Sequence, residues 1–278
     1  MATILTPAAR ISAGVPRPAG RAGFAGALRS EFTKIRSVRS TYWSLIALVL
    51  VTVGIGAAAG ASAAASHPGQ LGPGFDPTTT TLYGLVLGQL IIAVLGVVTV
   101  TSEYSTGMIR TSLAAMPRRG TVVAAKAAVF GAVALVTGLV ASFGAFFAGQ
   151  ALMSGRHLGA SLGQPDVLRA VIGGALFLTV CGLLGLGLGL ILRHAAAAIS
   201  AAVGLLFVLF ILALQLPASW KDQVGKWVPL NAGSQVWNAA ASPASDHMFS
   251  AWTGFAVFCG YAAIAIAGGL ILVRRRDA

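Results

Sequence analysis

The residues best suited to do chemistry in this chain lie in one polar stretch, "TSEYSTGMIRTSLAAMPRRG", which runs from Thr101 to Gly120. Long apolar runs flank it on both sides. Its single acid, Glu103, follows an apolar run almost at once, so its carboxylate is placed to meet a lysine or an arginine at a membrane edge. We interpret the stretch as a contact surface for a partner.

A short helix with an apolar side is expected in this stretch. Gly107 allows a turn before it, and Pro117 ends it, because proline disfavours helical geometry at the residue that precedes it. The expected contact residues combine an apolar ridge with a positive rim: Tyr104, Met108, Ile109, Arg110 and Arg118. A solvated positive loop without a partner is the alternative, but it leaves the exposed apolar side chains unexplained.

Motifs for catalysis are scarce. The chain lacks the GxxxxGK[ST] phosphate loop, and none of its four histidines opens an HExxH zinc motif. Cys181 and Cys259 lie in apolar runs without the paired spacing of a thiolate metal site. These patterns argue against an enzyme and against a cofactor held by the chain itself. An intramembrane enzyme built on the two cysteines stays open as an alternative.

The composition is that of a membrane protein. Hydrophobic residues make up 56% of the 278 residues and charged residues 9%, whereas soluble domains carry about 25% charged residues. The apolar runs are continuous rather than alternating, and each approaches or exceeds the roughly 20 residues of a spanning helix. We therefore expect an all-α polytopic membrane protein with six spans, near 42–65, 82–100, 122–153, 168–192, 195–216 and 251–273.

The charges predict the orientation. Fifteen of the nineteen lysines and arginines lie on the side of the N-terminus, and the net charge of +12 belongs to that side alone. Cytoplasmic segments carry the excess of basic residues, so both termini are expected in the cytoplasm and the chain in the cytoplasmic membrane. This distribution explains the positive net charge of the chain, so no role in nucleic-acid binding is needed to account for it.

The N-terminal part divides into two segments. Residues 1–22 are rich in Ala, Pro, Gly and Arg and are expected to form a disordered cytoplasmic leader, followed by one membrane domain at 23–278. From Phe24, apolar residues recur at helical spacing, which predicts a basic amphipathic helix in the headgroup plane, in contact with membrane lipid. The residues assigned to this interfacial helix are Arg29, Glu31, Phe32, Lys34 and Arg36. A plain topology anchor is the other interpretation.

The segment 217–250 is the longest one expected outside. It holds Trp220, Trp227 and Trp237, and tryptophan favours membrane interfaces. We interpret it as an interfacial belt, with an outer gate as the alternative. The spans themselves carry few ionisable residues, which disfavours an ion-coupled carrier and points to a hydrophobic or amphipathic cargo.

Three stretches together resemble a known family. "EFTKIRSVRSTYW", "TSEYSTGMIRTSLAAMPRRGTVVAAK" and "VPLNAGSQVW" are similar to the ABC-2 type permeases, especially their actinobacterial members, and the similarity covers nearly the whole chain from Leu28 on. The family pattern after the second span is matched by Glu103, Gly107, Arg110, Pro117, Arg118 and Lys126.

The resemblance implies the transmembrane subunit of an ATP-binding cassette exporter. In such exporters the interfacial helix and the loop after the second span, a short coupling helix, dock on a separate ATPase subunit that binds ATP and Mg²⁺. Two ATPase chains and two permease chains, identical or paralogous, form the working unit. The resemblance also implies an extracellular gate at Trp227, Pro229, Asn231 and Trp237. A membrane scaffold or immunity protein without transport is the alternative function.

Overall fold

The structure is a computed structural model that describes residues 23–67, 71–72, 74–108, 119–156, 158–217, 220, 223–239 and 248–276, without the side chain of Arg276. Within these residues it is helical and contains no strand. Six of its helices are long and apolar enough to cross a membrane, which confirms the predicted fold class. The leader expected at 1–22 lies outside the described residues.

The helices follow the apolar runs of the sequence. In chain order they are α1 Phe24–Ser37, α2 Arg39–Ala65, α3 Pro77–Leu82, α4 Leu85–Ser105, α6 Arg119–Met153, α7 Val167–Leu192, α8 Ala195–Val203, α9 Leu209–Leu214, α11 Pro229–Ser234 and α12 Ala251–Arg276. The candidate spans are Arg39–Ala65, Pro77–Ser105, Arg119–Arg156, Val167–Leu192, Ala195–Leu214 and Ala251–Arg275. The third span is longer than a bilayer needs, as its sequence predicts.

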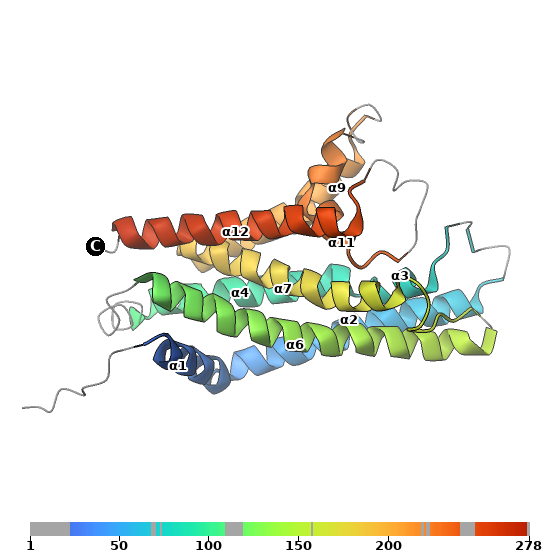
Figure 1. The fold of residues 1–278 in the computed structure, drawn as a ribbon, viewed down its shortest axis with the longest axis horizontal. Coiled ribbons are helices and arrows are strands. Elements are labelled where there is room, and N and C mark those ends of the chain that lie inside the picture. The colour runs from blue at the N-terminus through green and yellow to red at the C-terminus, as the bar shows by residue number, and fades with distance from the viewer. Residues whose placement is uncertain are drawn as a thin grey trace, which may run out of the picture.

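The long helices form one bundle around α4 and α7 (Figure 1). α2 and α6 pack on each other along one side, and α12 packs along α7 on the other. α4 and α7 approach closely because glycines on each helix face the backbone of the other helix. A Cβ at Gly185 would run into the carbonyl oxygen of Ala93, and one at Gly96 into that of Gly182. Small residues allow such contact between membrane helices, so the glycines have a packing role here.

The bundle has two distinct ends. At one end lie α1, the last turn of α4, the start of α6, the turn between α7 and α8 and the C-terminal turn of α12; we call it the α1 end (Figure 1). At the opposite end lie α3, the connection 158–166 and residues 223–239, which contain α11. We call this the α11 end, and residues 223–239 the α11 segment.

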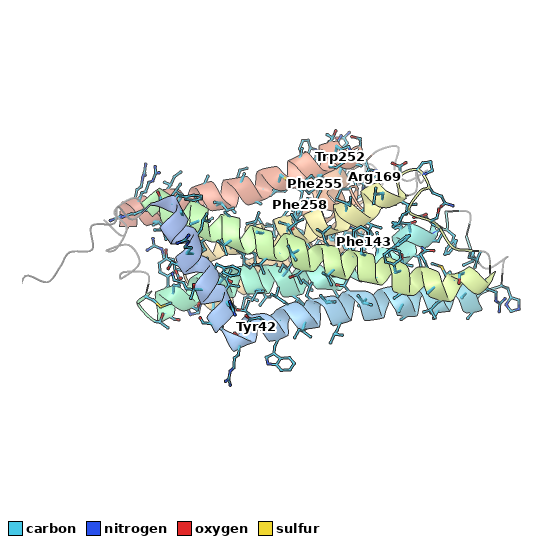
Figure 2. All side chains as sticks on the ribbon, turned by 60° about the horizontal axis from the view of Figure 1, so that its bottom comes forward. Tyr42, Phe143, Arg169, Trp252, Phe255 and Phe258 are labelled. Carbon is cyan, nitrogen blue, oxygen red and sulfur yellow. The ribbon has the colours of Figure 1, made fainter. Side chains whose placement is uncertain are left out.

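α1 is set apart from the helix that follows it. Val38 has extended backbone angles (φ −93°, ψ 111°), which interrupt the helical run between α1 and α2. Figure 2, where Tyr42 marks the first turns of α2, shows α1 running across the bundle rather than along it. The chain therefore turns sharply at Val38, and one face of α1 meets the ends of the long helices.

The fifth span is not a uniform α-helix. Gly204–Val208 forms a π-helical turn between α8 and α9. α8 packs on α4 and α7, whereas α9 points away from the bundle (Figure 1). π-turns inside helices change the direction of the faces that follow them. As a result Leu209, Ile211, Leu212 and Leu214 of α9 are exposed.

Candidate functional site

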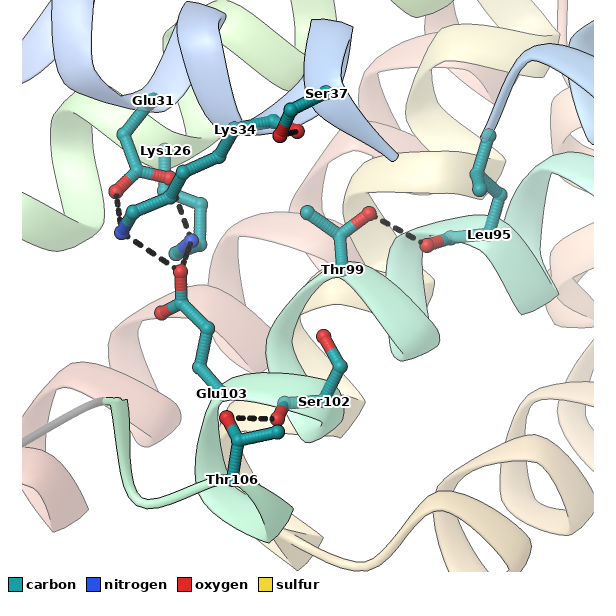
Figure 3. A network of polar contacts seen from close by, with 9 residues as sticks. All are labelled: Glu31, Lys34, Ser37, Leu95, Thr99, Ser102, Glu103, Thr106 and Lys126. Atoms are coloured by element: carbon teal, nitrogen blue, oxygen red, sulfur yellow. Dashed lines mark hydrogen bonds and ion pairs between the residues drawn. The ribbon is translucent and has the colours of Figure 1, made fainter. Parts of the chain in front are cut away.

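Four charged side chains from three helices meet at the α1 end (Figure 3). The Lys34 Nζ atom lies 2.7 Å from Glu31 Oε1 and 2.8 Å from Glu103 Oε1. The Lys126 Nζ atom lies 2.6 Å from Glu31 Oε2 and 2.8 Å from Glu103 Oε1. Each lysine therefore donates to both carboxylates. We call this closed arrangement of Glu31, Lys34, Glu103 and Lys126 the ion ring.

The ion ring is buried. Glu103 and Lys126 expose 3% of their side chains and Glu31 5%, while Lys34 exposes 25%. Removing an ion from water costs several kcal/mol, and here two lysines compensate the charges of two carboxylates. Burial alone would lower the pKa of Lys34, but hydrogen bonds to Glu103 and Glu31 and the charges of both carboxylates raise it above its ordinary value. Lys34 is therefore cationic at neutral pH.

The positions in sequence explain how the ring assembles. Glu31 and Lys34 are three residues apart on α1 and so share one face, together with the buried Ala27. Glu103 lies in the last turn of α4, at the negative end of that helix dipole, where lysines are favoured. Lys126 lies about two turns into α6. The ring thus attaches α1 to the two helices that flank residues 106–118.

The interfacial residues of α1 divide into two groups. Glu31 and Lys34 point into the bundle, whereas Arg29, Phe32 and Arg36 are exposed. The sequence pattern named Lys34 among the residues of the interfacial helix and gave no sign that its side chain turns toward the bundle. In the structure the ion pairs, rather than the apolar spacing, determine which face turns inward, and they leave Phe32 on an exposed flank.

The predicted contact stretch is described in its first part only. Glu103 and Tyr104 belong to the last turn of α4, so Glu103 is an internal residue rather than an exposed contact. Gly107 has a φ of +70°, the left-handed conformation that ends helices and favours glycine, and Met108 is exposed. The other residues assigned to the stretch lie outside the described residues: Ile109, Arg110, Pro117 and Arg118.

A second group of polar contacts holds the last turn of α12 at the α1 end. The Arg119 Nη1 atom donates to the carbonyl oxygens of Val273 (3.1 Å) and Arg274 (3.2 Å). The Arg193 Nη2 atom donates to that of Leu272 (3.2 Å), and its guanidinium lies 5.1 Å from the centre of the Tyr104 ring. We call Arg119 and Arg193 the arginine clamp.

Sequence reasoning missed the arginine clamp. It used Arg119 and Arg193 only as basic residues that indicate orientation. A signal was present, because Arg193 and His194 alone separate the fourth and fifth spans. Arg193 occupies the left-handed region (φ 56°) at the end of α7, so the tight turn fixes where its side chain begins.

The α11 segment holds the four residues assigned to the gate. Pro229 is buried in the first turn of α11, and the Asn231 side chain donates to Gly225 O (2.9 Å). Trp227 is 51% exposed, as an interfacial ring requires, but Trp237 is only 4% exposed. Trp237 packs against Tyr83 and Phe177 inside the bundle and so does not belong to a belt.

Arg169 at the start of α7 fixes the end of the α11 segment. Its guanidinium donates to the carbonyl oxygens of Gln235, Val236 and Asn238 at 3.0–3.3 Å and pairs with Asp166 (2.9 Å). The carbonyls of a short helix end need such donors. The α11 segment is therefore attached to α7 by several bonds from one side chain.

Among the described residues no group of three or more His, Cys, Asp and Glu could hold a metal ion, and both cysteines are free thiols. The string "GASLG" at 159–163 has the spacing of a nucleophile elbow. That motif needs a strand-to-helix turn, whereas Ser161 lies exposed in a connection between two helices. The ion ring, whose carboxylates are held by lysines, is suited to fixing helices rather than to proton transfer.

Comparison with known proteins agrees with this architecture. Residues 27–224 match the family described as ABC-2 family transporter protein, which is more than half of the chain. The match includes the ion ring, Arg119 and Arg193, and it ends before α11 and α12. No curated protein matches the chain. Because the family match spans most of a chain with six candidate spanning helices, the chain belongs to the ABC-2 family of transporter proteins.

Proposed function

We propose that this permease works in an ATP-driven exporter of the cytoplasmic membrane. Membership of the ABC-2 family makes the chain a membrane subunit of an ATP-binding cassette transporter and implies an ATPase partner. In the proposed complex that partner binds ATP and Mg²⁺ and hydrolyses the nucleotide, and the permease holds no cofactor. Two ATPase chains and a second permease chain, identical or paralogous, complete the working unit.

The distribution of charge supports an α1 end that faces the cytoplasm. The described basic residues at that end are Arg29, Lys34, Arg36, Arg39, Arg119, Lys126, Arg193, Arg274 and Arg275. They are opposed there by two acids, Glu31 and Glu103. At the α11 end the described basic residues Arg156, Arg169 and Lys226 face two acids, Asp76 and Asp166, which leaves a net charge of only +1 there. Basic residues accumulate on the cytoplasmic side, so both termini belong to that side.

The ion ring is the observation that carries the proposal. It joins α1 to α4 and α6, and these two helices flank residues 106–118, the stretch assigned to the ATPase. A force that the ATPase applies to α1 or to this stretch therefore enters the same two helices. Closure of the ATPase dimer would tilt them, and the two permeases would alternate between inward and outward openings by rocking.

The character of the spans supports a hydrophobic or amphipathic cargo. In the described part of the chain, charged residues of the spans lie near the span ends. A charged cargo would need compensating charges within the bilayer, which are costly and usually functional where they occur. Lipids, apolar drugs and peptides fit such a pathway.

The test replaces exposed arginines of α1, since Glu103 is buried and its removal would disturb the fold. We expect Arg29→Glu and Arg36→Glu to reach the membrane but to lose the ATPase subunit, because each places a negative charge on the proposed docking face. Arg156→Glu, an exposed reversal at the α11 end, is the matched control. The measurements are co-purification of an ATPase with the tagged chain and ATP-dependent transport in reconstituted vesicles.

Two results would contradict the proposal. One is normal transport with a bound ATPase in both α1 variants, which would remove α1 from the docking surface. The other is a wild-type chain that co-purifies with no ATPase. A wild-type chain that binds the ATPase but moves nothing would favour the scaffold alternative.

A further inference from the structure

The last turn of α12 receives both arginines of the clamp. The carbonyls near the end of a helix form the negative end of its dipole, so they bind guanidinium groups well. Arg119 donates hydrogen bonds to the carbonyl oxygens of Val273 and Arg274, and Arg193 donates to that of Leu272. The α1 end of α12 is therefore held by side chains from other parts of the bundle.

Both arginines also connect to the stretch proposed to meet the ATPase. Arg119 is the first described residue after that stretch and begins α6. Arg193 lies against the ring of Tyr104, a predicted contact residue in the last turn of α4. Both helices that flank residues 106–118, α4 through Tyr104 and Arg193 and α6 through Arg119, are thus connected to the C-terminal end of α12.

The opposite half of α12 contacts the α11 segment. The Tyr261 hydroxyl donates to Trp227 O (2.7 Å), and a Cβ at Gly254 would run into the carbonyl oxygen of Ala232. Phe258 stacks on Phe177 of α7 with ring centres 5.4 Å apart. Figure 2 shows Phe258 in the half of α12 that lies nearer Arg169. α12 is one unbroken helix of 26 residues between these contacts and the clamp.

We propose that α12 transmits movement from the α1 end to the α11 segment, and that Arg119 and Arg193 are the positioning residues that attach it. The inference rests on the proposed ATP-driven function. A continuous helix of 26 residues is about 39 Å long and moves as one body, so a displacement at the clamp reaches Tyr261 and Gly254. One side of α12 packs on α7 and α11, whereas Trp252, Ile264 and Ile271 on it are exposed in the single chain.

The experiment follows the α11 segment with a reporter thiol in the complete complex. Cys181 and Cys259 are replaced by alanine, and exposed Val224 by cysteine, in the chain purified with its ATPase and reconstituted in lipid nanodiscs, which leave both membrane faces open to solution. A membrane-impermeant maleimide then labels the reporter with and without ATP plus vanadate. We expect the labelling rate to differ between the two conditions in this reporter chain.

The clamp variants should remove that difference. In Arg119→Gln/Arg193→Gln we expect equal labelling rates with and without nucleotide, while the ATPase stays bound and still hydrolyses ATP. Arg275→Gln, which removes an exposed charge from the same helix end, should respond like the reporter chain. A purely structural role for the arginines would lower the yield of protein but leave the nucleotide response of the remainder intact.

A second variant tests the helix itself. Ile264→Pro interrupts α12 at an exposed position between the clamp and Tyr261 and leaves both arginines in place, with Ile264→Ala as its control. We expect it to abolish the response as well. An unchanged response in Ile264→Pro, or in the double glutamine chain, would overturn the proposal, and the proline variant decides if the glutamine chain fails to reach the membrane. Absence of ATPase binding or of any response in the reporter chain would instead refute the ATP-driven function.

Discussion

At the scale of single residues, the balance of charge in the ion ring matters more than any one of its bonds. Glu103 Oε1 receives both lysines, and each Glu31 oxygen receives one. Breaking a buried ion pair by removing one partner leaves a charge without compensation, whereas removing opposite charges together is far less costly. Lys126 and Lys34 allow a matched comparison, because both contact the same two carboxylates but differ in exposure.

We expect Lys126→Met to lower the free energy of unfolding by about 3–5 kcal/mol, since it leaves two buried carboxylates with one partly exposed lysine. Lys34→Met should cost less, because Lys34 is partly exposed and the remaining Lys126 is the buried lysine that contacts both carboxylates. Glu103→Gln/Lys126→Gln should recover much of the loss, since a neutral Glu31–Lys34 pair remains. Thermal unfolding of the purified chains in detergent measures these differences. Equal losses for the two lysine variants would show that the burial of a lysine does not determine how much it stabilises the fold.

At the scale of elements, the end of α4 is where the two contact systems meet. Glu103 contacts Lys34 of α1 and Lys126 of α6 in the ion ring. The ring of the adjacent Tyr104 lies against Arg193, whose guanidinium donates to α12. Adjacent residues on a helix point about 100° apart, so one turn can contact different neighbouring helices. Gly107 then ends the helix in a conformation that L-residues with a side chain rarely adopt.

For Gly107 we predict a graded response. Gly107→Val should lower stability by about 1–2 kcal/mol, the cost of a left-handed conformation for a residue with a Cβ atom. Gly107→Asn should cost less, since asparagine tolerates that region. Apart from its chain neighbours, no atom of the described residues lies within 4 Å of a Cβ built there, so the difference reports backbone conformation. Melting temperatures of the two variants test this, and identical values would contradict it.

At the scale of the whole molecule, the sequence predicts the six spans and places α1 with the C-terminal end of α12, because these follow from lengths of apolar runs and from charge. The face of α1 that meets the bundle was not predictable in this way, since the apolar spacing predicted only a side that contacts membrane lipid. The ion ring depends on residues up to 95 positions apart, which no local pattern relates. Trp237 was assigned to the interface by residue type, but its contacts with Phe177 and Tyr83 depend on tertiary packing.

The burial of the ion ring has a consequence for ionic strength. At about 1 M salt the screening length falls to about 3 Å, so contacts between exposed charges are weakened while buried pairs are screened much less. A concentrated salt wash should therefore release an ATPase bound through Arg29 and Arg36 yet leave α1 fastened to its bundle, which co-sedimentation and resistance of α1 to trypsin would reveal. The wash that removes the ATPase would then leave a folded permease, which should bind the ATPase again once the salt is diluted.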